Sequence, residues 1–181
     1  MVIKEPWESY PELWKDQKAF MSYLRGAFRS VWASYPAKHV WKKAQMRKPP
    51  AGYVGKAKSV GNCVFCGELL PASKLEVDHV TQAGSFSNKQ EGVEWLYKLL
   101  DTNHNWQLTC NPCHKIKSLQ ERTEGMTFEQ ARVSKEIIRL LKKENAKEML
   151  QILSKAGYNG TSVSNNTKRK AVLTTILNKE I

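Results

Sequence analysis

The sequence predicts an α+β protein in which helices at both ends of the chain flank a centre of short strands. Apolar residues recur every three or four positions toward both termini, and apolar and polar residues alternate around residue 76. Two Cys-x-x-Cys pairs enclose this centre. The chain has 181 residues, 41% hydrophobic and 25% charged, which is typical of one folded domain with appendages.

Residues 1–61 are expected to form a helical region that ends in a linker. Ser9 and Glu12 have the spacing of a capping box, and apolar residues then recur at helical intervals as far as Pro36. A shorter helix is expected over residues 37–44, before a stretch rich in Pro, Gly and Lys. The tryptophans in these helical patterns are interpreted as core residues rather than as platforms for stacked bases. They are Trp7, Trp14, Trp32 and Trp41.

Residues 62–122 are expected to form the central module. The alternation over residues 74–79 predicts a strand, and a second short strand is expected over 106–109. Helical spacing predicts a helix over 90–101, inside the connection between the strands, and another over 111–122.

Residues 123–181 are expected to form a C-terminal helical region. Thr127 and Gln130 have capping-box spacing and predict a helix that runs to about residue 144. Two further helices are expected over 146–156 and 167–179, separated by a stretch rich in Gly, Ser and Asn.

The charge of the chain is strongly positive and unevenly placed. The formal net charge is +12, and residues 17–67 contain ten Lys or Arg and no Asp or Glu. A basic stripe of this kind is typical of a surface that contacts nucleic acid, although a solvated helix face followed by a flexible loop has the same composition. The candidate nucleic-acid-binding residues in this stripe are Lys42, Lys43, Arg47 and Lys48.

No part of the sequence predicts a membrane segment. No stretch approaches the ~18 consecutive apolar residues that a membrane span needs, and residues 1–14 lack the apolar core of a signal peptide. We therefore expect a cytoplasmic protein without a membrane partner.

The cysteines occur only as two tight pairs. Cys63 and Cys66 form one pair, Cys110 and Cys113 form the other, and 43 residues separate the two. Four thiolates from two such pairs can surround one zinc ion at ~2.3 Å. A thioredoxin-like redox site normally has one pair before a helix, and disulfides are unusual without a secretory signal. We therefore expect a structural Zn²⁺ site.

Other polar residues lie between or beside the cysteine pairs in a particular order. Asp78 and His79 end the first expected strand, Asn105 precedes the second, and His114 follows the last cysteine. The segments V-D-H-V and N-W-Q-L-T-C-N-P-C-H-K-I-K-S, at residues 77–80 and 105–118, resemble the HNH nucleases with zinc-binding knuckles. These nucleases are a branch of the ββα-metal endonucleases, and the resemblance covers about residues 62–118.

The resemblance implies a ββα-metal HNH core with a separate zinc knuckle of four cysteines, flanked by a DNA-binding N-terminal region and a C-terminal helical region. It implies that His79 is the general base, that Asp78 and His114 hold a catalytic Mg²⁺ or Mn²⁺, and that Asn105 orients the imidazole of His79. Such residues suit hydrolysis of a phosphodiester, because a neutral His accepts a proton near neutral pH and a hard cation acts as a Lewis acid.

Three further residues near this motif are candidates for a role at the site. Lys115 and Lys117 follow His114 and are candidate phosphate contacts, with two solvated helix lysines as the alternative. His104, next to Asn105, is the residue most easily mistaken for the base or for a ligand.

The flanking sequences favour one kind of nuclease over others. The segment L-R-G-A-F-R-S-V-W resembles the leader of small phage-encoded HNH proteins, and the C-terminal segments resemble the helical tail of phage junction-resolving endonucleases of the endonuclease VII type. His114 stands where the endonuclease VII pattern has Asn, which favours a homing or nicking enzyme over a junction-resolving enzyme. Outside the nucleases, the competing functions are a non-catalytic zinc-knuckle DNA-binding module and an RNA-binding zinc protein.

The expected partner is double-stranded DNA, with branched DNA as a further substrate. One active site per chain can cut both strands only as a homodimer or by two sequential nicks. A phage-encoded enzyme would act in the host cytoplasm.

Overall fold

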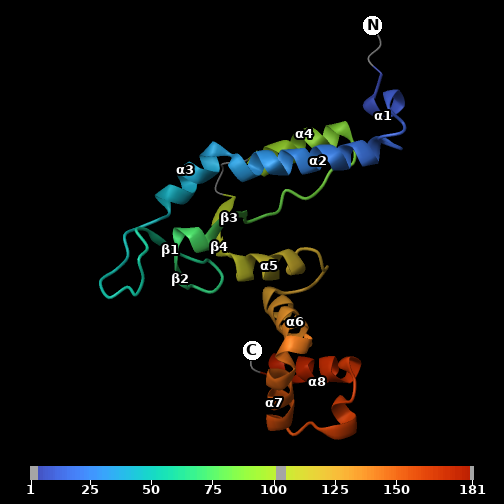
Figure 1. Cartoon of the computed structure of the whole chain (residues 1–181). Helices are drawn as coiled ribbons and strands as arrows, with labels where there is room; N and C mark the ends of the chain where they lie inside the picture. The colour runs from blue at the N-terminus through green and yellow to red at the C-terminus, as the bar shows by residue number, and fades with distance from the viewer. Residues whose placement is uncertain (1–3, 101–104, 180–181) are drawn as a thin grey trace. The chain divides into compact units, whose positions relative to one another are not determined.

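The computed structural model describes residues 4–100 and 105–179 and has an α+β fold, as the sequence predicts. Helices account for most of the described chain, and two small antiparallel sheets lie in its N-terminal part (Figure 1). Two compact units, Met1–Asn111 and Pro112–Ile181, divide the chain, and each is described by itself.

The first unit begins with three helices: α1 (Pro6–Ser9), α2 (Gln17–Ser34) and α3 (Pro36–Ala44). The expected start of the long helix near Ser9 was wrong, because the Asp16 carboxylate accepts a hydrogen bond from the Ala19 N–H at 2.8 Å and caps α2 there. Pro36 occupies the first turn of α3, where a helix needs no N–H donor from that residue. The helix expected over residues 37–44 is confirmed.

Helix α4 (Lys89–Leu100) lies beside α2 and shares an apolar cluster with it. Met21 of α2 and Trp95 and Leu99 of α4 are buried in this cluster together with Phe86. The expected core role is confirmed for Trp7 and Trp32, which pack against these residues.

Two antiparallel strand pairs follow α3 in the fold. Strands β1 (Val60–Asn62) and β2 (Leu69–Pro71) pair with each other, and a short 3₁₀ turn, η1 (Ala72–Lys74), leads to β3 (Leu75–His79). β3 pairs with β4 (Trp106–Cys110), so that His79 lies opposite Trp106 and Leu75 opposite Cys110. Both strands predicted from the sequence are confirmed.

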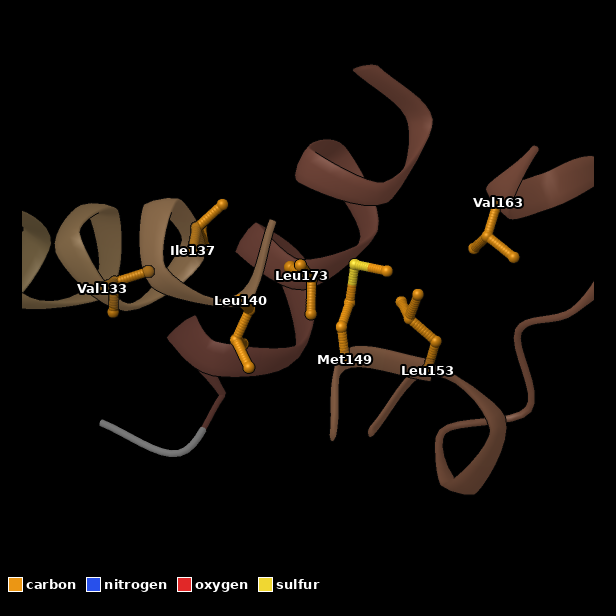
Figure 2. Close-up of a cluster of buried hydrophobic side chains, with 7 residues drawn as sticks. All are labelled: Val133, Ile137, Leu140, Met149, Leu153, Val163 and Leu173. Carbon is orange, nitrogen blue, oxygen red and sulfur yellow. The ribbon is translucent and has the colours of Figure 1, made fainter. Parts of the chain in front are cut away.

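The second unit is helical. It contains α5 (Asn111–Gln120, whose first residue closes the first unit), α6 (Phe128–Leu140), η2 (Lys143–Asn145), α7 (Ala146–Lys155), η3 (Gly160–Val163) and α8 (Asn166–Asn178). The predicted capping box before α6 is confirmed, with Thr127 and Gln130 exchanging two hydrogen bonds. Buried side chains from α6, α7, η3 and α8 form one apolar core, and Figure 2 shows them as sticks. They are Val133, Ile137, Leu140, Met149, Leu153, Val163 and Leu173.

We expect Leu153→Ala to destabilise this core by about 2–5 kcal/mol, because it removes a fully buried side chain and leaves a cavity. Leu150→Ala on the same helix is the matched control, since Leu150 is 48% exposed, and we expect it to change stability by less than about 0.5 kcal/mol. Urea unfolding followed by far-ultraviolet circular dichroism measures both. Equal losses in the two variants would contradict the assignment of this core.

Candidate metal centre and the residues around it

The four cysteines gather at one point of the fold. Their sulfur atoms all lie within 4.8 Å of one another. Cys63, Cys110 and Cys113 are buried, and Cys66 is exposed. Four thiols this close can hold a metal ion such as zinc, which takes tetrahedral thiolate sites of this kind. Among residues 4–100 and 105–179, no other group of three or more His, Cys, Asp or Glu side chains is arranged for a metal.

Local backbone bonds explain why the first pair of cysteines forms a metal-binding turn. The Gly67 N–H donates to the Cys63 carbonyl at 2.9 Å, and Gly67 has φ 70°, a conformation that favours glycine. The Val64 N–H donates to the Leu108 carbonyl at 2.9 Å, and the Cys110 N–H donates to the Cys63 sulfur at 3.4 Å. These bonds attach the turn to β4, where the second pair of cysteines begins.

Backbone N–H groups that point at the Cys63 sulfur change the acidity of this thiol. Burial raises the pKa of this thiol, but backbone N–H groups of Cys66, Cys110 and Phe65 donate to the sulfur and together lower its pKa to about 6. The lowered pKa means that the thiolate stabilises the folded state at high pH, and that this contribution is lost as the pH falls through about 6.

We expect metal affinity to fall more steeply below about pH 6, because a proton then competes with the metal for Cys63. Each further pH unit is expected to add about a tenfold loss from this one thiol. Competition with a chromogenic zinc chelator between pH 5 and pH 8 measures the slope. A slope that does not change near pH 6 would contradict the prediction.

His79 lies at the end of β3 and is only 8% exposed. Its Nε2 atom lies 2.8 Å from the carbonyl oxygen of Leu99, the buried residue near the end of α4. A carbonyl only accepts hydrogen bonds, so Nε2 is the donor of this bond and carries a hydrogen. The Trp32 ring covers the imidazole, with ring centroids 4.4 Å apart.

Asp78 precedes His79 on the same strand. The Gln107 amide of β4 donates to Asp78 Oδ2 at 3.0 Å, which follows from the pairing of these two residues in the strand register. Adjacent residues of a strand point to opposite faces, so this carboxylate and the imidazole of His79 leave β3 in different directions.

Asn105 anchors the backbone just after His79. Its amide donates to the Thr81 carbonyl at 3.0 Å and accepts from the Thr81 N–H at 2.8 Å, and its own carbonyl accepts from the Val80 N–H at 2.8 Å. The orienting role of Asn105 stays a prediction. Asn105 would orient His79 indirectly, through the backbone of Val80 and Thr81. The carbonyl that binds the imidazole comes from Leu99, which sequence reasoning missed because backbone carbonyls carry no sequence signal.

The residues that follow Cys113 lie on α5. His114 is half-buried and belongs to the second unit, whereas Asp78 belongs to the first, so their role as joint ligands stays a prediction. Lys117 is buried, and its ammonium pairs at 2.5 Å with Glu121, the residue just after α5. Lys115 is exposed and stays the better candidate for a phosphate contact. His104 lies outside the described residues.

The four basic residues singled out in the sequence meet in one concave surface, here called the basic groove. Its volume is about 450 Å³, and none of the described residues that line it is acidic. The Lys42 ammonium donates to the Leu75 carbonyl at 2.6 Å and ties the groove to β3, while the Arg47 guanidinium donates to Asn62. The lining residues are His39, Lys42, Lys43, Met46, Arg47, Lys48, Lys58, Ser59 and Ala72.

None of the helices in residues 4–100 and 105–179 has both the length and the apolar character needed to cross a membrane. Comparison with protein-family models, with curated protein sequences and with solved structures gave no match.

Proposed function

We propose that this chain is a metal-dependent DNA endonuclease of the HNH type, in which His79 is the general base. The observation that carries the proposal is the hydrogen bond from His79 Nε2 to the Leu99 carbonyl. In a neutral imidazole with its hydrogen on Nε2, Nδ1 is the nitrogen that would take a proton from water, and the bond to Leu99 would hold the ring in one orientation. The neighbouring Asp78 and the zinc-knuckle motif support the same interpretation.

Asp78 and His114 are the proposed ligands of a catalytic Mg²⁺ or Mn²⁺. A carboxylate and a neutral imidazole are donors that such ions accept, and most of the remaining positions of the ion would be filled by water and phosphate oxygens. A bound divalent ion would supply Lewis-acid stabilisation of the phosphate charge and of the leaving oxygen. The four-cysteine site has a separate role, because it would hold the module together through a structural Zn²⁺.

The basic groove is proposed to bind the phosphate backbone of double-stranded DNA. Lys43, Arg47 and Lys48 are exposed on this surface, and all but one of the lining residues come from the stretch of residues 17–67 that contains no Asp or Glu. A phage-encoded homing or nicking enzyme is the proposed biological type. Cutting both strands would need a homodimer or two sequential nicks.

We expect the purified zinc-loaded protein to convert supercoiled plasmid to nicked or linear DNA when Mg²⁺ or Mn²⁺ is added, and to stop when EDTA removes the ion. Agarose electrophoresis distinguishes one cut strand from two. A four-way DNA junction is the second substrate, and selective cleavage of the junction would favour the junction-resolving alternative. Binding of both DNAs without cleavage of either would contradict the endonuclease and support a non-catalytic zinc-knuckle module.

We expect the double variant Lys43→Ala, Lys48→Ala to bind duplex DNA more weakly and with a smaller dependence on salt. Each lost phosphate contact lowers the slope of log affinity against log salt concentration by about 0.9. Fluorescence anisotropy across a salt series measures both effects. The matched control is Lys142→Ala, Lys143→Ala, which removes the same charge from two exposed residues of the second unit. An equal loss of affinity in the two variants would show that only net charge matters.

A further inference from the structure

Trp32, near the end of α2, lies against the face of the His79 ring. The two ring centroids are 4.4 Å apart and the ring planes are tilted by 37°. The Leu99 carbonyl binds the same imidazole at its edge, at 2.8 Å from Nε2. The hydrogen bond to Leu99 holds the edge of the ring, and the Trp32 ring blocks movement of the imidazole toward that face. Together the two contacts limit rotation about both side-chain torsions of His79.

Trp32 is itself held in place from several sides. The Lys38 ammonium lies 4.8 Å from the centre of the Trp32 ring and donates to the carbonyls of Trp32 and Ala33 at 2.8 and 2.9 Å. These two bonds attach the Lys38 side chain to the last turn of α2, where the Trp32 carbonyl also accepts from the Tyr35 N–H at 3.2 Å. The Trp106 ring, opposite His79 in the sheet, lies 5.6 Å from Trp32 by ring centroids.

A second aromatic residue of α2, Phe28, offers a control that distinguishes packing on the apolar cluster from contact with the imidazole. Phe28 is one helical turn before Trp32, is half-buried like Trp32, and packs against the same apolar cluster. Its ring contacts Trp95 at a centroid distance of 6.3 Å. Both residues therefore help to hold α2 on the cluster, and Trp32 in addition stacks on His79.

We propose that Trp32 is a positioning residue that, together with the Leu99 carbonyl, holds the imidazole of His79 in a single orientation. The N-terminal helices would then complete the active site as well as bear the basic groove. This inference rests on the proposed function, because a fixed imidazole accelerates cleavage only if His79 is the base.

The test compares Trp32→Ala, Trp32→Phe and Phe28→Ala in the full-length zinc-loaded protein. We expect Trp32→Ala to lower kcat for plasmid cleavage by about 100-fold, the order of loss that follows misplacement of a reacting group. The KM and the affinity for duplex DNA are expected to change by less than threefold. Trp32→Phe keeps an aromatic face on the imidazole and is expected to restore kcat to within fivefold of the wild type. Phe28→Ala is expected to lower the thermal midpoint and to leave kcat within threefold below that midpoint.

Nitrogen-15 NMR of the His79 ring supplies a readout that does not depend on cleavage. We expect the wild type to show one tautomer, with the hydrogen on Nε2, and Trp32→Ala to show ring nitrogen shifts averaged between tautomers. Wild-type kcat in Trp32→Ala together with unchanged nitrogen shifts would overturn the inference. A wild type that does not cleave would refute the proposed function instead, and the NMR comparison would still decide whether Trp32 fixes the ring. If Trp32→Ala does not fold, the same comparison is made between the wild type and Trp32→Leu.

Discussion

Replacing Cys110 with Ser is expected to remove the metal and unfold the module built on β1–β4. Cys110 is buried at the end of β4, and its sulfur is one of the four that meet within 4.8 Å. A serine hydroxyl stays protonated at neutral pH and is a poor ligand for zinc. Binding of a structural zinc contributes about 10–16 kcal/mol in small zinc modules, which is as large as the ~5–15 kcal/mol net stability of a typical domain.

Metal content and folding are measured together for this variant. We expect one zinc per chain in the wild type and none in Cys110→Ser, by atomic emission, with loss of near-ultraviolet circular dichroism from the tryptophans that surround β4. Val64→Ser is the matched control, because Val64 lies within the first cysteine pair but is 59% exposed. A Cys110→Ser protein with a full complement of zinc and wild-type unfolding would contradict the metal centre.

The second unit is expected to survive this loss in part. Its apolar core is formed by side chains of α6, α7, η3 and α8, and no cysteine belongs to it. Far-ultraviolet circular dichroism of Cys110→Ser should therefore keep a helical signal that still unfolds cooperatively in urea. Leu153→Ala added to Cys110→Ser should then lower the urea midpoint of that remaining signal.

The parts of the fold predicted well from the sequence are those with local signals. The alternation over residues 74–79 predicted β3, the capping box at Thr127 predicted α6, and the spacing of the cysteines predicted their cluster. In each case the physical cause acts between residues near one another in the chain, or through one strongly specific chemistry. The start of α2 was misplaced because Asp16, which the sequence pattern did not single out, is the residue whose carboxylate reaches an N–H of the helix.

The surroundings of His79 could not be predicted in the same way. Trp32, the Leu99 carbonyl and His79 are far apart in the sequence and meet only through the packing of α2 and α4. The burial of Lys117 is a similar case, because a lysine on an amphipathic helix looks the same in sequence whether its ammonium faces solvent or Glu121. Candidate residues are therefore readable from a motif, whereas the groups that orient them depend on tertiary contacts.

Replacing His79 with Gln is expected to lower the cleavage rate by about 100-fold to 10⁴-fold, the range that general-base catalysis contributes. The Gln amide can still donate a hydrogen bond toward the Leu99 carbonyl, but it cannot take up a proton from water. This substitution therefore separates the chemistry of the base from the packing of its side chain better than His79→Ala, which also leaves a cavity beneath Trp32. Initial rates on supercoiled plasmid at saturating Mg²⁺ or Mn²⁺ measure the effect, and anisotropy measures DNA affinity, which should stay near that of the wild type.

His39→Gln is the matched control because it makes the same chemical change at a residue outside β3. His39 is exposed and lines the basic groove. We expect its cleavage rate to stay within about threefold of the wild type, because any phosphate contact it makes contributes to binding rather than to proton transfer. If His79→Gln cleaves at the wild-type rate, His79 is not the base. If both variants lose activity equally, the loss reflects DNA binding, and the general base must be sought among other residues.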